Sequence, residues 1–256
     1  GCGGCAVPMP SSSSETPYCQ TDLGSALCPE FPLIALFRFA GPLLDNALKT
    51  KHVREILAAI ENFHFLFTQV TSQRSSGGIS SMYSSAARRL SSAKDETERL
   101  ALLKEIIEKL TERIPGEDEF QVHFAKILFS DRFAKQRRTV KYILSKFAQD
   151  ENTSIVPDFS QMTIEHILPQ SVDQDLDEAD AQAIAQLGNL ILVPQSLNSK
   201  LGEKDFSKKR TVLQNNGVRL DKILRDADKW DIERIRVRTR ENGLRAYRNL
   251  WKIEQI

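Results

Sequence analysis

The chain has 256 residues, which is enough for one large domain or two small ones. Its apolar content of 41% and charged content of 27% are ordinary for a soluble globular protein. No stretch approaches the ~18 apolar residues of a membrane span, and no basic leader followed by an apolar run opens the chain. A membrane protein and a secreted protein are therefore not expected. The net charge of +1 says nothing about partners until it is divided by region.

The first thirty residues are rich in Gly, Pro, Ser and Cys and contain no Lys or Arg. Such a composition buries too little apolar surface to offset its ordering entropy, so a disordered tail is predicted over residues 1–30. The spacing of the first two cysteines matches half of a zinc knuckle, but eight residues separate the other two, which favours free thiols. The absence of cysteine from the rest of the chain suits a reducing, cytoplasmic compartment. All four cysteines lie in this tail: Cys2, Cys5, Cys19 and Cys28.

Helical periodicity dominates residues 31–150, which are predicted to form an α-helical domain. Apolar residues recur at helical spacing over 53–67, 100–114, 120–128 and 140–147, with polar linkers at 71–81 and 91–94. Pro115 and Gly116 are expected to end the second of these helices. His52, His64 and His123 lie on or beside the helices without carboxylates at ligand spacing, so packing or surface roles are favoured for them.

A second domain is predicted over residues 155–256, after a polar stretch at 150–158. The apolar run Met162–Ile164 leads into Glu165 and predicts a strand, and a second strand is predicted at 190–193. Helices are expected at 196–201 and 206–213 and again towards the C-terminus. The predicted fold class is α+β and predominantly α-helical, with the order strand, long loop, strand, helix in the second domain.

The pair Glu165-His166 is the strongest chemical signal. An imidazole titrates near neutrality and can take a proton from water, and a carboxylate is a ligand type that Mg²⁺ and Mn²⁺ prefer. Adjacent strand residues point to opposite faces, so the two side chains share a site only where the strand ends. Pro169 provides such a break, because it restricts the preceding residue and lacks a backbone donor.

Two asparagines follow this pair. Asn189, after Gly188, is placed to hydrogen-bond the loop that follows His166 and hold the imidazole in position. Asn198 lies in the predicted helix after the second strand, where its amide oxygen would complete a metal shell. Each alone is ordinary, as a Gly-Asn turn or a helix-start asparagine. Their order after Glu165-His166 makes a common site the favoured interpretation.

The chain resembles the HNH nuclease domain at the C-terminus of GmrSD-type restriction endonucleases and, more locally, the HNH domain of RNA-guided DNA nucleases. The resemblance covers about residues 155–251, and the helical region from Phe31 is also similar to the part that precedes HNH in these proteins. It implies a helical bundle followed by a ββα-metal core with C-terminal helices. The residues that carry it are Glu165 to Gln170, Leu187 to Leu190, Asn198 to Leu201, Phe206, Lys209 and Trp230.

By this resemblance the catalytic residues are His166, as general base, and Asn189, as the brace of its loop. Glu165 and Asn198 would face a single Mg²⁺ or Mn²⁺ ion. Relatives usually begin with a ParB-like nucleotide-binding domain, which the low-complexity tail cannot supply, so a separate or missing domain of that type is expected. No cysteine follows residue 28, so the zinc ribbon of some HNH proteins is absent.

Positive charge near the predicted site makes DNA the expected partner. One metal site makes one cut, so nicking is expected, or double cleavage by a homodimer. The acidic stretch 173–180 would repel DNA and is placed away from the substrate or on a mobile flap. The predicted nucleic-acid-binding residues are Lys200, Lys204, Lys208, Lys209 and Arg210.

Two other functions remain open from the sequence. A catalytically inactive HNH-derived module would bind DNA or a protein without cutting. An interaction bundle unrelated to nucleic acid would explain the helices but leave the order of Glu165, His166 and the two asparagines as coincidence.

Overall fold

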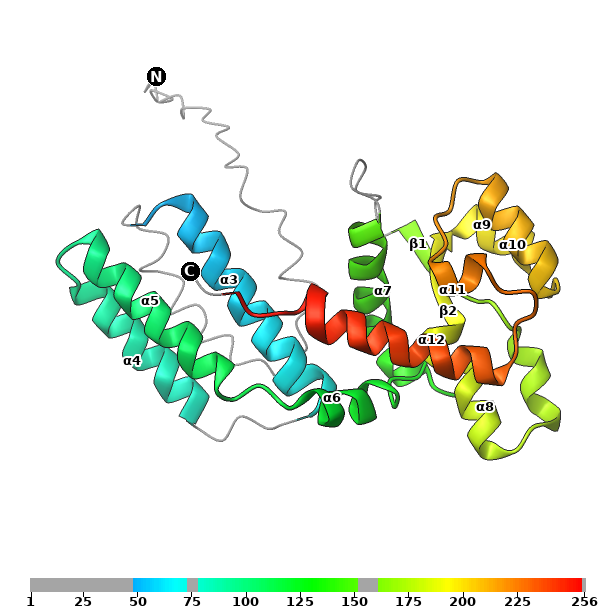
Figure 1. Cartoon of the computed structure of the whole chain (residues 1–256), viewed down its shortest axis with the longest axis horizontal. Coiled ribbons are helices and arrows are strands. Elements are labelled where there is room, and N and C mark those ends of the chain that lie inside the picture. Colours follow the sequence, from blue (N-terminus) through cyan, green and yellow to red (C-terminus); the bar gives the residue numbers. More distant parts are fainter. Residues whose placement is uncertain (1–47, 73–77, 152–160, 255–256) are drawn as a thin grey trace, which may run out of the picture.

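The protein is described by a computed structural model over residues 48–72, 78–151 and 161–254. The predicted disordered tail and its cysteines lie outside these residues. The predicted fold class is confirmed, since the described chain is mostly helical with one two-stranded antiparallel sheet (Figure 1). No described helix combines the length and the apolar character needed to cross a bilayer.

The elements follow one another in the order shown in Figure 1. They are α3 (Thr50–His64), a π-helical turn (Phe65–Val70), α4 (Gly78–Ser92), α5 (Glu96–Thr111), α6 (Glu117–Phe124), α7 (Arg137–Glu151), β1 (Met162–His166), α8 (Glu178–Ile184), β2 (Leu190–Pro194), α9 (Gln195–Leu201), α10 (Phe206–Asn215), α11 (Lys222–Arg225), α12 (Ile232–Arg245) and a second π-helical turn (Ala246–Leu250).

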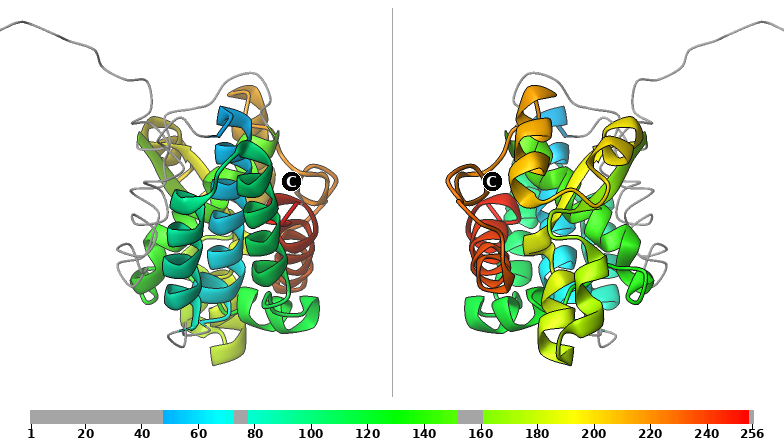
Figure 2. Two further views of the ribbon diagram at one scale, coloured as in Figure 1. Left: turned by 90° about the vertical axis from the view of Figure 1, so that its left-hand side faces the viewer. Right: turned by 90° about the vertical axis from the view of Figure 1, so that its right-hand side faces the viewer.

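Three helices form the N-terminal layer of the described chain. The helices α3, α4 and α5 lie side by side, as Figure 2 shows from their exposed side. The predicted helices over 53–67 and 100–114 are confirmed as α3 and α5. The linker predicted to reach residue 81 is wrong at its end, because α4 already begins at Gly78. Ile79 and Tyr83 lie four residues apart on one face of α4, and the burial of this face stabilises the first turn of the helix.

The small sheet joins two hydrophobic cores because β2 is buried on both faces. The strands pair antiparallel, with Glu165 opposite Ile191 and His166 opposite Leu190. Leu190 and Leu192 point into a core shared with α6 and α7, and Ile191 and Val193 point into a core built from α9 to α12. A strand that is apolar at consecutive positions, as β2 is from Leu190 to Val193, is typical of burial on both faces.

The long loop predicted between the strands contains a short helix that the sequence analysis did not predict. This helix, α8, begins after Asp177, whose side chain accepts a hydrogen bond from the amide of Asp180 at 2.9 Å. The burial of Ala181, Ala183 and Ile184 anchors it to the rest of the protein. Local capping and these three buried apolar residues order part of the acidic stretch.

The C-terminal helix ties the two halves of the chain together. From the sheet, α12 runs back towards α6 and the N-terminal helices (Figure 1). The π-helical turn after it places the buried indole of Trp251 on the ring of Phe65, with the ring centroids 3.8 Å apart. The indole N–H donates to the Tyr142 hydroxyl at 3.2 Å. Residues far apart in the sequence thus share one core.

Candidate functional site

An open, polar cavity of about 570 Å³ lies beside β1. Glu165, His166 and Asn198 all line it. Glu165 and His166 are consecutive strand residues that face opposite sides of the sheet. Both reach the cavity because β1 ends at His166 and has a strand partner on one edge, β2, among the described residues. Three of the four predicted site residues are therefore brought to one place.

The imidazole of His166 is held by two hydrogen bonds that fix its tautomer. Nε2 lies 2.8 Å from the backbone oxygen of Phe129, which can only accept, so Nε2 carries the proton. Gln170 accepts from the amide of Asp131 at 2.9 Å through Oε1, which turns its NH₂ group towards Nδ1 at 3.3 Å. Both contacts leave the lone pair of His166 on Nδ1.

Burial lowers the pKa of His166, while the carbonyl of Phe129 opposes that shift. The ring is nearly covered, with the phenyl ring of Phe129 stacked at a centroid distance of 5.9 Å. The imidazole is therefore neutral at neutral pH, which is the form that can accept a proton.

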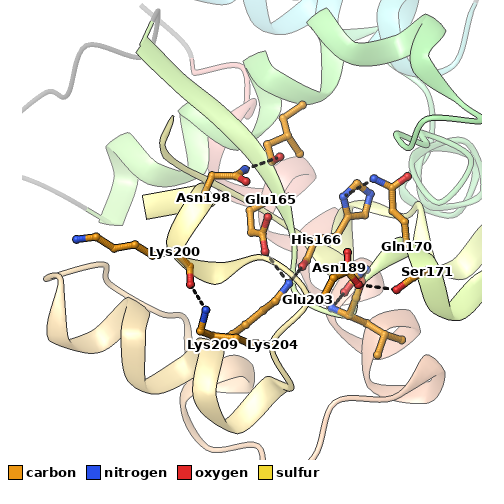
Figure 3. A network of polar contacts seen from close by, with 12 residues as sticks. Glu165, His166, Gln170, Ser171, Asn189, Asn198, Lys200, Glu203, Lys204 and Lys209 are labelled. Carbon is orange, nitrogen blue, oxygen red and sulfur yellow. Dashed lines mark hydrogen bonds and ion pairs between the residues drawn. The ribbon is translucent and has the colours of Figure 1, made fainter. Parts of the chain in front are cut away.

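Glu165 is buried and paired with a buried lysine. Its Oε1 accepts a hydrogen bond from Nζ of Lys209 at 2.6 Å, and the same ammonium group donates to the backbone oxygen of His166 at 2.6 Å. Burial raises the pKa of Glu165, and Lys209 opposes that shift by hydrogen bonding and by its charge. A single ammonium group thus fixes both residues of the Glu-His pair (Figure 3).

Asn198 is positioned by its own amide nitrogen. Nδ2 donates to the hydroxyl of Thr163 at 3.0 Å and to the backbone oxygen of Ile164 at 3.3 Å. The carboxamide oxygen consequently lies on the side of Glu165 (Figure 3). Asn198 lies in α9, which begins at the residue after the end of β2. This direct connection between strand and helix fixes the position of the carboxamide oxygen.

Asn189 is completely buried and does not line the cavity. Its Oδ1 accepts from the amide of Leu168 at 2.8 Å and from the indole of Trp230 at 3.1 Å. Its Nδ2 donates to the backbone oxygens of Leu168 at 2.9 Å and Ile184 at 2.8 Å. The side chain therefore fastens the loop after His166 and does not line the cavity.

The five predicted nucleic-acid-binding residues differ in their surroundings. Lys200, Lys204 and Lys208 are exposed, although Lys204 donates to the backbone oxygen of Lys200 and Lys208 pairs with Asp205 at 2.7 Å. Lys209 lies in a different setting from the three exposed lysines, because its ammonium group is buried and pairs with Glu165.

Arg210, also predicted to bind nucleic acid, is held by contacts within the protein. Its guanidinium donates to the backbone oxygens of Ala227 and Arg225 and stacks over the ring of Phe206. It is half-buried, and its Nη1 atom is already hydrogen-bonded within the protein, so fewer of its donors face solvent.

Several residues at the site carried no signal that spacing could reveal. Phe129 lies 37 positions before His166, and only the fold brings its carbonyl to the imidazole. Glu203 lines the cavity and accepts a hydrogen bond from Ser171 at 2.5 Å. Gln170 and Trp230 were part of the recognised motif, but their contacts with His166 and Asn189 follow from tertiary structure alone.

The strand pair, the helix behind it and the polar cavity at its open edge define an α+β unit within a mostly helical protein. Residues 114–241 match the family model of GmrSD restriction endonucleases, C-terminal domain. That match covers half of the chain, so the protein belongs to this family. No curated protein matches the chain. The membership assigns the chain to a class of restriction-type nucleases.

Proposed function

We propose that this protein is a metal-dependent DNA endonuclease of the HNH type that cuts one strand per active centre. One observation carries the proposal. The hydrogen bonds to Phe129 and Gln170 leave the lone pair of His166 on Nδ1, in a cavity that Glu165 and Asn198 also line. Metal-dependent hydrolysis of a phosphodiester requires a neutral base that accepts the proton of water and oxygen ligands that hold a divalent cation.

His166 acts as the general base in this scheme. Water loses a proton to Nδ1, and its oxygen forms a bond to phosphorus as the bond to the 3′ oxygen breaks. The 3′ oxygen takes a proton from solvent. The bond from Nε2 to the carbonyl of Phe129 stabilises the imidazolium that forms. Gln170 must yield its place at Nδ1 to the water, and its long contact of 3.3 Å is a weak one to replace.

Glu165 and Asn198 would hold the ion. A carboxylate has about four lone-pair sites, so the contact with Lys209 leaves acceptor capacity for a cation. No group of three His, Cys, Asp or Glu side chains with metal-binding geometry occurs within the described ranges. Mg²⁺ commonly takes one or two carboxylates, with water and substrate phosphate completing its shell, so this donor set fits. The ion would neutralise charge developing on the phosphate and the leaving oxygen.

A binding module without catalysis is the second candidate, and the ion pair of Glu165 with Lys209 favours it. An ammonium group 2.6 Å from the carboxylate opposes the approach of a divalent cation. Titration calorimetry with Mn²⁺ on the wild type and on Glu165→Ala separates the two candidates. Heat of binding that disappears in the variant supports the enzyme, and no heat in either protein supports the binding module.

The test of the enzyme is nicking of supercoiled plasmid DNA in Mn²⁺. His166→Ala should abolish nicking and leave the circular dichroism spectrum unchanged. His123→Ala on α6 is the matched control and should cut like the wild type, because His123 lies outside the cavity. Undiminished nicking by His166→Ala would remove the base assignment. A double-strand break would require two copies of the chain, which sedimentation in the presence of DNA would show.

A further inference from the structure

A second basic surface lies beside the cavity, in the helical half of the chain. Residues 126–138 contain five basic residues and one acidic residue, Asp131. All five basic side chains are exposed. We call them the 126–138 basic segment: Lys126, Arg132, Lys135, Arg137 and Arg138.

The segment is connected to the candidate base through the cavity wall and the ring of Phe129. Arg132 lines the cavity. The ring of Phe129 stacks on the imidazole of His166, and the guanidinium carbon of Arg137 lies 6.0 Å from the centre of the same ring. A phosphate held by these side chains would therefore lie next to the phosphodiester that the cavity receives.

The protein itself neutralises little of this charge. Within the described ranges, the segment makes one ion pair, between Arg132 and Glu178 at 3.5 Å. Their side chains are 55% and 68% exposed, so the pair is weak and a phosphate can replace its acidic member. By contrast, Arg236 and Arg238 of α12 pair with Asp180 and Asp221 at 2.6 and 2.7 Å.

The position of two of these residues on α7 is an independent observation. Lys135 lies in a 3-10 turn, Ala134–Gln136, that runs directly into this 15-residue helix, whose first two residues are Arg137 and Arg138. No acidic residue occupies either the 3-10 turn or the first turn of α7. Positive side chains at a helix N-terminus oppose the helix dipole, whereas an anion there is stabilised. A bound phosphate would relieve the repulsion between these guanidinium groups and the helix end.

We propose that the 126–138 basic segment binds the phosphate backbone of duplex DNA on the side of the scissile phosphate that faces α7. This proposal rests on the proposed function, since it assumes that the cavity receives a DNA strand. It adds a surface to the three exposed lysines 200, 204 and 208 on the other side of β1. The helical region before the sheet then contributes directly to substrate binding.

The experiment measures the affinity of a short labelled DNA duplex over a series of salt concentrations in EDTA, so that no cleavage contributes. The test variant combines Lys135→Gln, Arg137→Gln and Arg138→Gln. The control removes the same charges from exposed positions on α3, α4 and α5, with Arg54→Gln, Arg88→Gln and Lys104→Gln. Circular dichroism and thermal unfolding verify that both variants fold.

The test variant should bind about tenfold or more weakly, and its plot of log affinity against log salt should lose about two to three units of slope. The control should bind like the wild type. The charge-retaining variant Arg137→Lys with Arg138→Lys should keep most of the wild-type affinity, because phosphate contacts depend more on the positive charge than on the shape of the side chain. Affinity and slope unchanged in the test variant would overturn the proposal.

The failure of this surface can be told apart from the failure of the proposed function. If the wild type nicks plasmid and the test variant nicks it equally well, the proposed nuclease function stands and the role of the 126–138 basic segment is excluded. A wild type that neither binds the duplex nor nicks plasmid would remove both. A stronger competition by single-stranded RNA than by duplex DNA, at the same salt concentration, would overturn the assignment to duplex DNA.

Discussion

At the scale of single residues, Lys209 is the side chain on which the geometry of the Glu-His pair depends. It is 2% exposed, and it donates hydrogen bonds to both Glu165 and the backbone of His166. A buried charge is tolerated when it is paired and hydrogen-bonded, and removing one partner leaves the other uncompensated. Lys209 therefore holds Glu165 and the backbone of His166 in place from a buried position.

We expect Lys209→Met to lower the free energy of unfolding by about 3–5 kcal/mol, because it leaves the buried carboxylate of Glu165 without its positively charged partner. Urea denaturation at neutral pH measures the loss. Lys208→Met is the matched control: this neighbouring lysine is exposed, and its variant should unfold like the wild type. Adding Glu165→Gln to Lys209→Met should recover part of the stability, and no recovery would contradict the stated cause.

Gly188 lies where a side chain has no room. A Cβ atom there would come within 2.1 Å of the backbone oxygen of Ile235 and 2.4 Å of the hydroxyl of Thr239. The backbone of α12 must shift to admit it, so Gly188→Ala should cost about 1–3 kcal/mol or more in unfolding free energy. Gly116→Ala, with open space around the position, should cost much less. Equal losses in urea denaturation would exclude the steric explanation.

At the scale of elements, the contact between α3 and α4 contains a buried histidine. His64 of α3 is 2% exposed and lies 3.0 Å from the hydroxyl of Tyr83 on α4. Burial lowers the pKa of His64 from 6.5 to about 4. The contact between these helices is therefore built for a neutral imidazole, as the packing role expected for this histidine requires.

This shift makes stability depend on pH. The unfolded chain binds a proton at His64 below about pH 6.5 and the folded protein does so only near pH 4, so protonation favours unfolding in this window. His64 should remove up to about 3 kcal/mol of stability as the pH falls from 6.5 through 4. Urea denaturation over this range measures the loss. His64→Gln should show a shallower decline, and an unchanged slope would contradict the prediction.

At the scale of the whole molecule, β2 and Trp251 join regions that the sequence analysis divided. The division into domains at 31–150 and 155–256 stays a prediction. The family match begins at residue 114, inside the first of these regions. Phe124 and Val140 from that region share a core with Leu190 of β2. Such a shared core favours unfolding as one unit.

The two tryptophans of the chain can test this. Trp230 belongs to the core around α9 to α12, and Trp251 to the core shared with α6 and α7. In Trp230→Phe and Trp251→Phe, the remaining indole reports on one core. We expect the fluorescence transitions of both variants to coincide with their own far-ultraviolet circular dichroism transitions in urea. Fluorescence and dichroism midpoints that separate within one variant would show two independent units.

The sequence by itself determined most of the helices, the two strands and three of the residues that line the cavity, Glu165, His166 and Asn198. Apolar periodicity predicted α3 and α7, because a helix face or strand face must be buried wherever it lies. The order of Glu165, His166 and Asn198 predicted a common site because a strand pair and the following helix are local in the chain. Both signals depend on the distance between residues along the chain, which can be read directly from the sequence.

Tertiary structure alone decided which charges are available and which groups hold the imidazole. Lys209 and Lys208 are adjacent lysines, yet one is buried against Glu165 and the other is exposed, because the helix turns one side chain inward and the other outward. The carbonyl of Phe129 reaches His166 across 37 residues of chain. No residue spacing in the sequence signals either contact, because contacts between distant segments form only when both cores pack around β2.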